Sequence, residues 1–128
     1  MKMKMKCILA LDDMPPVLSL IRSMLRTQYQ VFPFTCADTA MEFLEQDDVV
    51  AIDCVLLDID MPGISGIEVL RTLKSHPALR DVPVIMVTGN SDRDTVLKAI
   101  QAGAKDYIVK PFTEDILKKK IRSVLHKE

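Results

Sequence analysis

The sequence predicts an α/β protein: a doubly wound parallel sheet of five strands, with five helices packed on its two faces. Five short apolar segments alternate with five segments whose apolar residues recur at helical spacing. The first, third and fourth strand-like segments are apolar along their whole length, as expected of strands that helices cover on both faces. Right-handed crossovers between such strands close a doubly wound sheet.

Each element is expected within a defined stretch of the chain. The strands are expected at Lys6–Leu11, Tyr29–Ala37, Ala51–Asp58, Val82–Thr88 and Lys105–Phe112. Pro33 lies inside the second of these and places it at an edge of the sheet, because proline has no N–H to donate to a neighbouring strand. The helices are expected within Pro15–Tyr29, Asp38–Gln46, Ser65–His76, Ser91–Ala104 and Thr113–Lys127.

The predicted helix ends carry residue types that suit them. Pro15 and Pro16 fit a first turn, where a missing N–H costs nothing. Ser65 followed by Glu68 is a capping-box pattern. Ser91 and Thr113 are expected as N-caps, and Gly103 as the residue that ends its helix. The run Lys118–Lys120 is interpreted as a solvated helix face.

The composition is that of one folded domain, residues 1–128, with residues 1–5 expected as a frayed leader. A net charge of -1 gives no bulk attraction to nucleic acid or to an acidic membrane, so neither is an expected partner. No apolar run approaches the roughly 18 residues of a membrane helix. Three widely spaced cysteines, Cys7, Cys36 and Cys54, are expected as buried thiols in a reducing compartment. We therefore expect a cytoplasmic protein.

Polar side chains follow four of the predicted strands. Asp12 and Asp13 follow the first strand, Asp58 ends the third, Thr88 ends the fourth, and Lys110 follows the apolar part of the fifth. In a doubly wound sheet, the site lies beyond the carboxyl ends of the central strands, so these side chains are expected to converge.

The chemistry of these residue types indicates a cation and a phosphoryl group. Clustered carboxylates repel one another and need a positive charge. Hard oxygen ligands select magnesium, calcium or manganese, and a small number of carboxylates favours magnesium. A metal ion, a lysine and a hydroxyl are what a phosphoryl group needs around it, and a carboxylate can itself be the nucleophile, which gives an aspartyl phosphate.

Four motifs together resemble the receiver domain of a two-component response regulator. They are "LALDDM", "VLLDIDMPGISGIEVL", "VIMVTGNSD" and "GAKDYIVKPF". Each motif alone is weak, but their order and spacing are specific, and the resemblance covers essentially the whole chain. It implies a single-domain receiver with a flavodoxin-like fold and the strand order 2-1-3-4-5.

The resemblance assigns the acceptor and the metal ligands. Asp58 matches the aspartate that accepts the phosphoryl group. Asp12 and Asp13 match the acidic pair that, with Asp58 and the backbone carbonyl of Asp60, holds Mg2+, for which Mn2+ can substitute. Asp60 and Asn90 occupy the positions that tune how long the phosphoryl group survives.

The resemblance also assigns the switch. Thr88 matches the hydroxyl that moves toward the phosphoryl group, and Lys110 matches the lysine that pairs with it. Pro111 matches the proline that follows a cis peptide bond with Lys110. Tyr107 matches the aromatic residue whose rotamer follows the switch.

These assignments imply a phosphorylation-controlled signalling switch. The phosphoryl donor is a phosphohistidine on a histidine kinase or a phosphotransfer protein, and the shifted surface of the fourth helix, fifth strand and fifth helix binds a downstream protein. The protein is expected to be a monomer that catalyses only its own phosphorylation and dephosphorylation. Dimerisation on phosphorylation, the identity of the partners, the phosphoryl lifetime and the presence of further domains stay open.

Two alternatives and one departure from the family pattern accompany this interpretation. The stretch "DIDMPG" also resembles a haloacid-dehalogenase-like phosphatase, but Pro62 stands where that family has Thr or Val. In that family the motif lies near the N-terminus, whereas here it lies in the middle of the chain. A receiver-like module that no longer accepts phosphate is the second alternative. Met14 follows the acidic pair, where the family often has an acid; we expect it to alter the first loop and to leave metal binding intact.

Overall fold

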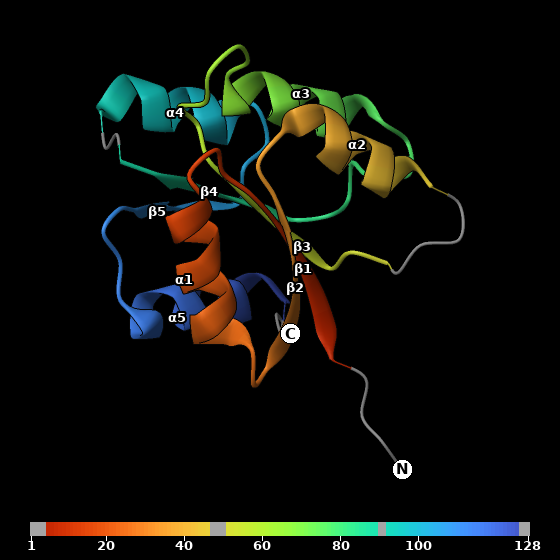
Figure 1. Ribbon diagram of the computed structural model, residues 1–128. Coiled ribbons are helices and arrows are strands. Elements are labelled where there is room, and N and C mark those ends of the chain that lie inside the picture. Colours follow the sequence, from red (N-terminus) through yellow and green to blue (C-terminus); the bar gives the residue numbers. More distant parts are fainter. Residues whose placement is uncertain (1–4, 47–50, 90–91, 126–128) are drawn as a thin grey trace.

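The sheet has the predicted topology. The computed structural model describes residues 5–46, 51–89 and 92–125, so the predicted leader lies, except for Met5, outside the described residues. The parallel strands lie in the order β2-β1-β3-β4-β5, with α2, α3 and α4 on one face and α1 and α5 on the other (Figure 1). The strands are β1 (Lys6–Leu11), β2 (Tyr29–Phe34), β3 (Cys54–Leu57), β4 (Val84–Thr88) and β5 (Asp106–Val109). The helices are α1 (Pro15–Leu25), α2 (Ala37–Glu45), α3 (Gly66–Ser75), α4 (Arg93–Gln101) and α5 (Glu114–Leu125).

Alternate residues of the central strands divide the hydrophobic core into two layers. In β1, Leu9 and Leu11 pack with the residues of α2, α3 and α4, whereas Ile8 and Ala10 pack with those of α1 and α5. All residues of β3 and β4 are buried. This two-sided packing gives the loops at the carboxyl ends of the strands a rigid base. No helix within the described ranges is long and apolar enough to cross a membrane.

Several predicted helix ends are confirmed. Pro15–Pro16 forms the first turn of α1. The Ser65 hydroxyl accepts a hydrogen bond from the N–H of Ile67 at 3.1 Å, which caps α3. The Thr113 hydroxyl accepts one from the N–H of Ile116 at 3.2 Å, at the start of α5. Each hydroxyl satisfies an N–H that has no partner within its helix.

The start of α4 differs from the prediction, and its end agrees with it. The N-cap is Asp92, whose carboxylate accepts a hydrogen bond from the N–H of Thr95 at 3.3 Å. The predicted cap, Ser91, lies outside the described residues and one position too early, because Ser and Asp cap equally well and the sequence did not separate them. Gly103 follows the helix with a φ of 115°, and it ends α4 as predicted.

The first helix ends earlier than expected, whereas the second strand begins at Tyr29 as expected. The helix ends at Leu25, because Tyr29 is the first residue of β2 and pairs with Lys6 of β1. Pro33 lies in β2 at the edge of the sheet, as predicted. Cys36 follows this strand and is exposed, so the prediction of three buried thiols is wrong for this residue.

The third strand is shorter than the predicted Ala51–Asp58. It begins at Cys54, because the side chain of the preceding residue, Asp53, takes part in the hydrogen bonding to β1. The Asp53 N–H donates to the Cys7 carbonyl oxygen at 2.8 Å, and its carboxylate accepts the Cys7 N–H at 2.8 Å. A side chain thus replaces the next backbone partner and ends the ladder.

Gly66, the first residue of α3, lies against the backbone that follows β3. Its N–H donates to the Ile59 carbonyl oxygen at 2.8 Å. A Cβ at this position would overlap the carbonyl oxygen of Asp58 and would lie 2.9 Å from the Cα of Ile59. The absence of a side chain therefore allows α3 to support the segment that carries Asp58.

Gly66→Ala is expected to lower the free energy of unfolding by about 1–3 kcal/mol, because the added methyl group displaces a buried backbone segment. Gly89→Ala is the matched control: nothing lies within 4 Å of its added Cβ, and a change within about 1 kcal/mol is expected. Urea unfolding of both variants provides the measurement. Equal stability of the two would contradict the close approach of α3.

Candidate functional site

The side chains of the site follow the last residues of neighbouring strands. The last residues of β1 and β3 are register partners, so Asp12 and Asp58 leave the sheet at the same level. The Asp58 N–H donates to the carbonyl oxygen of Leu11 at 3.0 Å, and the Lys110 N–H donates to that of Thr88 at 2.8 Å. The hydrogen-bonded ladder therefore extends to the site residues and fixes their backbone.

Three carboxylates form a cluster at this edge. Asp12, Asp13 and Asp58 each place one oxygen within 4.8 Å of the others. Asp12 and Asp58 are buried, at 2% and 3% exposure, and Asp13 is half-buried. The Met14 N–H donates to Asp12 Oδ1 at 2.9 Å, so the residue that departs from the family pattern fixes the Asp12 carboxylate through its backbone.

Lys110 supplies positive charge to the cluster. Its Nζ lies 2.8 Å from Asp12 Oδ2 and 3.5 Å from Asp58 Oδ1, and the peptide bond between Lys110 and Pro111 is cis. One ammonium against three carboxylates leaves two negative charges uncompensated among these four groups. Two excess charges on closely spaced hard oxygen donors fit a small divalent cation.

The pKa values of Asp58 and Lys110 reflect this crowding. Burial, followed by the charge of Asp12, raises the pKa of Asp58 to about 6, while Lys110 and a hydrogen bond from the backbone of Asp60 act in the opposite direction. Burial acts to lower the pKa of Lys110, but its contacts with Asp12 and Asp58 outweigh burial and raise it. Lys110 is therefore a fixed cation at neutral pH, and Asp58 is an ionised carboxylate in an unfavourable environment.

The remaining predicted site residues lie at different distances from this cluster. Thr88 is the last residue of β4 and is fully buried at the same edge. Tyr107 is 36% exposed and lines a surface hollow with α4, so the structure does not bring its ring into the cluster. Asp60 is exposed, and its backbone bonds to the carboxylate of Asp58. Asn90 lies outside the described residues.

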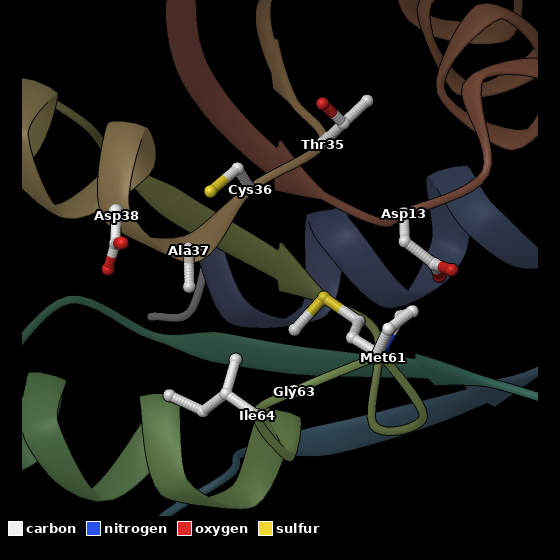
Figure 2. A pocket seen from close by; sticks show the side chains of 9 residues that line it. Asp13, Thr35, Cys36, Ala37, Asp38, Met61, Gly63 and Ile64 are labelled. Carbon is white, nitrogen blue, oxygen red and sulfur yellow. The ribbon is translucent and has the colours of Figure 1, made fainter.

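A hollow of about 480 Å³ opens beside Asp13. Figure 2 shows Asp13 on one side and Cys36 and Asp38 on the other, with Met61 between them. The loops that follow β1, β2 and β3 and the first residues of α2 line it with Asp13, Thr35, Cys36, Ala37, Asp38, Met61, Pro62, Gly63 and Ile64. The acidic cluster thus borders an open space that is large enough for a small ligand.

Some residues that shape this region were missed from the sequence. Gly66 was not singled out, although a glycine at the first position of an amphipathic helix was an available signal.

Lys118 lies 2.6 Å from Glu114, and Lys120 lies 3.0 Å from Asp106. The face predicted to be solvated is exposed at Lys119 and partly exposed at Lys118 and Lys120, which pair with acidic side chains. The partner of Lys120 is 14 positions away in sequence, which no local pattern reveals.

Comparison with known proteins identifies the family. The sequence matches the response regulator receiver domain over residues 8–122. Chemotaxis protein CheY from Pseudomonas aeruginosa is 34% identical over 122 residues, which cover 94% of this chain and 96% of CheY.

Two solved structures are similar as well. The receiver domain of DrrB, a Thermotoga maritima protein, in a form activated by beryllium trifluoride, is 31% identical with a TM-score of 0.84; the match covers 97% of this chain and 100% of that one. The Mn2+-bound form of the response regulator Rcp1 is 26% identical with a TM-score of 0.80; the match covers 96% of each chain.

The chain belongs to the response regulator receiver domain family and is a CheY-like receiver of two-component signalling. This confirms the family and the fold that the four motifs predicted, and it removes the phosphatase alternative. Receiver domains of this kind act as signalling switches and not as enzymes with a separate substrate.

Asp58→Asn is expected to stabilise the metal-free protein at pH 7.5 by on the order of 1 kcal/mol, because it removes a poorly compensated buried charge. The pKa of Asp58 is raised by folding, so the folded state binds the proton more tightly than the unfolded chain. The penalty is therefore present above pH 6 and disappears as the pH falls from about 6 toward 4. Urea unfolding in EDTA at pH 7.5 and 4.5 measures it. A difference between the two proteins that does not shrink at the lower pH would contradict this assignment.

Proposed function

We propose that this protein is a phosphorylation-controlled switch in which Asp58 accepts a phosphoryl group. The observation that carries the proposal is the position of Asp58, buried at the carboxyl edge of the sheet beside Asp12, with the ammonium of Lys110 close to both carboxylates. An ionised carboxylate with a fixed backbone and an adjacent cation is a suitable nucleophile for phosphorus.

A divalent cation completes the proposed site. Asp12, Asp13, Asp58 and the backbone carbonyl of Asp60 would hold Mg2+, with Mn2+ as a substitute. The oxygen-only donor set and the two uncompensated negative charges support this choice, as does the Mn2+-bound form of Rcp1. When bound, the cation supplies charge neutralisation for the phosphoryl oxygens.

The proposed transfer step balances without a further reactant. A carboxylate oxygen of Asp58 forms a bond to phosphorus, and the P–N bond of a phosphohistidine on a kinase or phosphotransfer protein breaks. The electron pair of that bond returns to the imidazole nitrogen. The phosphohistidine ring carries a proton on its other nitrogen, so the ring leaves as neutral imidazole, and the product is a mixed anhydride on Asp58. Lys110 stays protonated throughout and offers its ammonium to a phosphoryl oxygen. Asp60 and Asn90 are proposed to tune the later attack of water.

The proposed output is a change in the surface formed by α4, β5 and α5. Thr88, buried at the end of β4, is the hydroxyl proposed to respond to the phosphoryl group, and Tyr107 on the neighbouring strand is proposed to follow it. The surface exposes several large apolar side chains that suit a downstream protein: Leu97, Ile100, Tyr107, Val109 and Ile116. The unphosphorylated protein is proposed to be a monomer.

Incubation with Mg2+ and acetyl phosphate is expected to add one phosphoryl group to the wild type, read as a mass increment of the intact protein that is lost on standing. Asp58→Asn should show no increment, because the nucleophile is gone. Asp60→Asn is the matched control: it changes the other acid of the same "DID" stretch and should still be labelled. Labelling of Asp58→Asn at the wild-type rate would refute the proposal.

Asp13→Asn is expected to weaken Mn2+ binding at least about ten-fold, because it removes one of few charged ligands. Electron paramagnetic resonance of free Mn2+ measures the affinity, and competition with Mg2+ extends it to the proposed physiological ion. Asp38→Asn, on the opposite side of the hollow beside Asp13, should leave the affinity within about two-fold, since an exposed distant charge is screened. Equal losses of Mn2+ affinity in the two variants would indicate non-specific attraction to negative charge and would contradict a defined metal site.

A further inference from the structure

Tyr107 lies on β5, the last strand of the sheet, which has a neighbouring strand on one side only. It pairs with Met86 of β4, and Val109, two residues further along, pairs with Thr88. Alternate residues of a strand point to the same face, so Tyr107 and Thr88 belong to the same face of the sheet. On that face, the ring of Tyr107 lines a hollow with Val96, Leu97 and Ile100 of α4.

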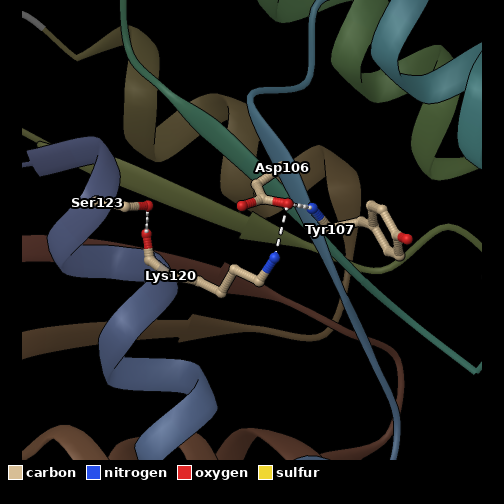
Figure 3. Close-up of polar contacts among 4 residues, drawn as sticks. All are labelled: Asp106, Tyr107, Lys120 and Ser123. Carbon is tan, nitrogen blue, oxygen red and sulfur yellow. Dashed lines mark hydrogen bonds and ion pairs between the residues drawn. The ribbon is translucent and has the colours of Figure 1, made fainter.

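Lys120 of α5 reaches this tyrosine from the other side of the sheet. Its Nζ lies 3.0 Å from Asp106 Oδ1 and 5.7 Å from the centroid of the Tyr107 ring. The same Asp106 oxygen accepts the backbone N–H of Tyr107 at 2.8 Å. Figure 3 shows Lys120 extending from α5 to Asp106, with the Tyr107 ring beyond it. One ammonium therefore contacts both the residue before the ring and the ring itself.

The edge position of β5 makes this arrangement possible. Asp106 and Tyr107 are successive residues of one strand, so their side chains point to opposite faces, one toward α5 and the other toward α4. Because β5 is the last strand of the sheet, no neighbour blocks the path around its outer edge. The Asp106 carboxylate also satisfies a strand N–H that β4 does not reach on that side.

We propose that Lys120 is a positioning residue that holds the Tyr107 ring at the surface in the unphosphorylated protein. Asp106 anchors the ammonium, and the ammonium attracts the face of the ring. This inference deepens the proposed function and rests on it, because it concerns the regulation of the same switch. Lys120 lies outside the four motifs that define the family in this chain.

A consequence follows from linkage. If phosphorylation moves the ring of Tyr107 away from the surface, it must break the contact with Lys120. An exposed cation–π contact favours the surface position by roughly two- to five-fold. Removing the ammonium should therefore raise the population of the inward ring and, reciprocally, tighten binding of a phosphoryl analogue by about the same factor.

The ring position can be measured in the free protein. The chain has two tyrosines and no tryptophan, so incorporated 3-fluorotyrosine gives two 19F signals, and Tyr107→Phe assigns them. Lys120→Met keeps the aliphatic stem, removes the charge and should shift the Tyr107 signal. Lys120→Arg should restore it, and Lys119→Met, on the adjacent exposed residue, should leave it unchanged. Tyr29 is buried and reports whether the fold is intact.

Asp106→Asn tests the same ion pair by removing the charge of Asp106 instead of that of Lys120. It keeps the inference open to refutation if Lys120→Met folds poorly. It should shift the Tyr107 signal in the same direction. A Tyr107 signal that is the same in wild type, Lys120→Met and Asp106→Asn would overturn the proposal.

A double-mutant cycle separates positioning from a general structural effect. Affinity for beryllium trifluoride with Mg2+ is measured in wild type, Lys120→Met, Tyr107→Leu and the double variant. If Lys120 acts through the ring, its replacement tightens binding about two- to five-fold in the wild type and has no effect in the Tyr107→Leu background. An equal effect in both backgrounds would overturn the inference. Absence of binding to the wild type would instead count against the proposed function, and the 19F experiment would still decide the role of Lys120.

Discussion

The confinement of three carboxylates with one ammonium is the constraint on which this structure depends. Asp12 and Asp58 leave adjacent strands at the same level and are almost fully buried, so neither can move apart from the other. Lys110 compensates one charge of three. The apolar layers on both faces of the sheet supply the free energy that holds these groups together against their repulsion. A divalent cation at this edge would relieve the imbalance.

The surrounding backbone is shaped to keep that cluster in place. The Met14 N–H orients the carboxylate of Asp12, and the backbone of Asp60 donates to that of Asp58. Gly66 lets the start of α3 lie directly against the segment that carries Asp58. None of these contacts brings a further charged side chain to the cluster, so they fix its geometry without adding to the electrostatic crowding. The half-buried Asp13 connects the buried pair to the open hollow beside it.

The two proposed switch residues lie on the last two strands of the sheet. Thr88 is buried at the end of β4, and Tyr107 stands on the neighbouring edge strand with its ring exposed. Lys120 and Asp106 lie at this edge: the ammonium is 3.0 Å from Asp106 Oδ1 and 5.7 Å from the centroid of the ring, which we propose it holds at the surface. The contact lies outside the acidic cluster, and we propose that it sets the balance between the two positions of the ring.

The sequence by itself determined the fold and most of the site. Apolar periodicity decided the five strands and five helices, because burial on one or two faces imposes a period that can be counted. The position of Asp12, Asp13, Asp58, Thr88 and Lys110 after their strands was also visible, since parallel strands present their carboxyl ends at one edge. The cap of α4 and the shorter third strand were not, because Ser and Asp cap alike and the side chain of Asp53 replaced a backbone partner. Only the tertiary structure could decide that Gly66 touches Asp58 and that Lys120 reaches Tyr107, because these contacts join different elements and depend on how closely those elements pack.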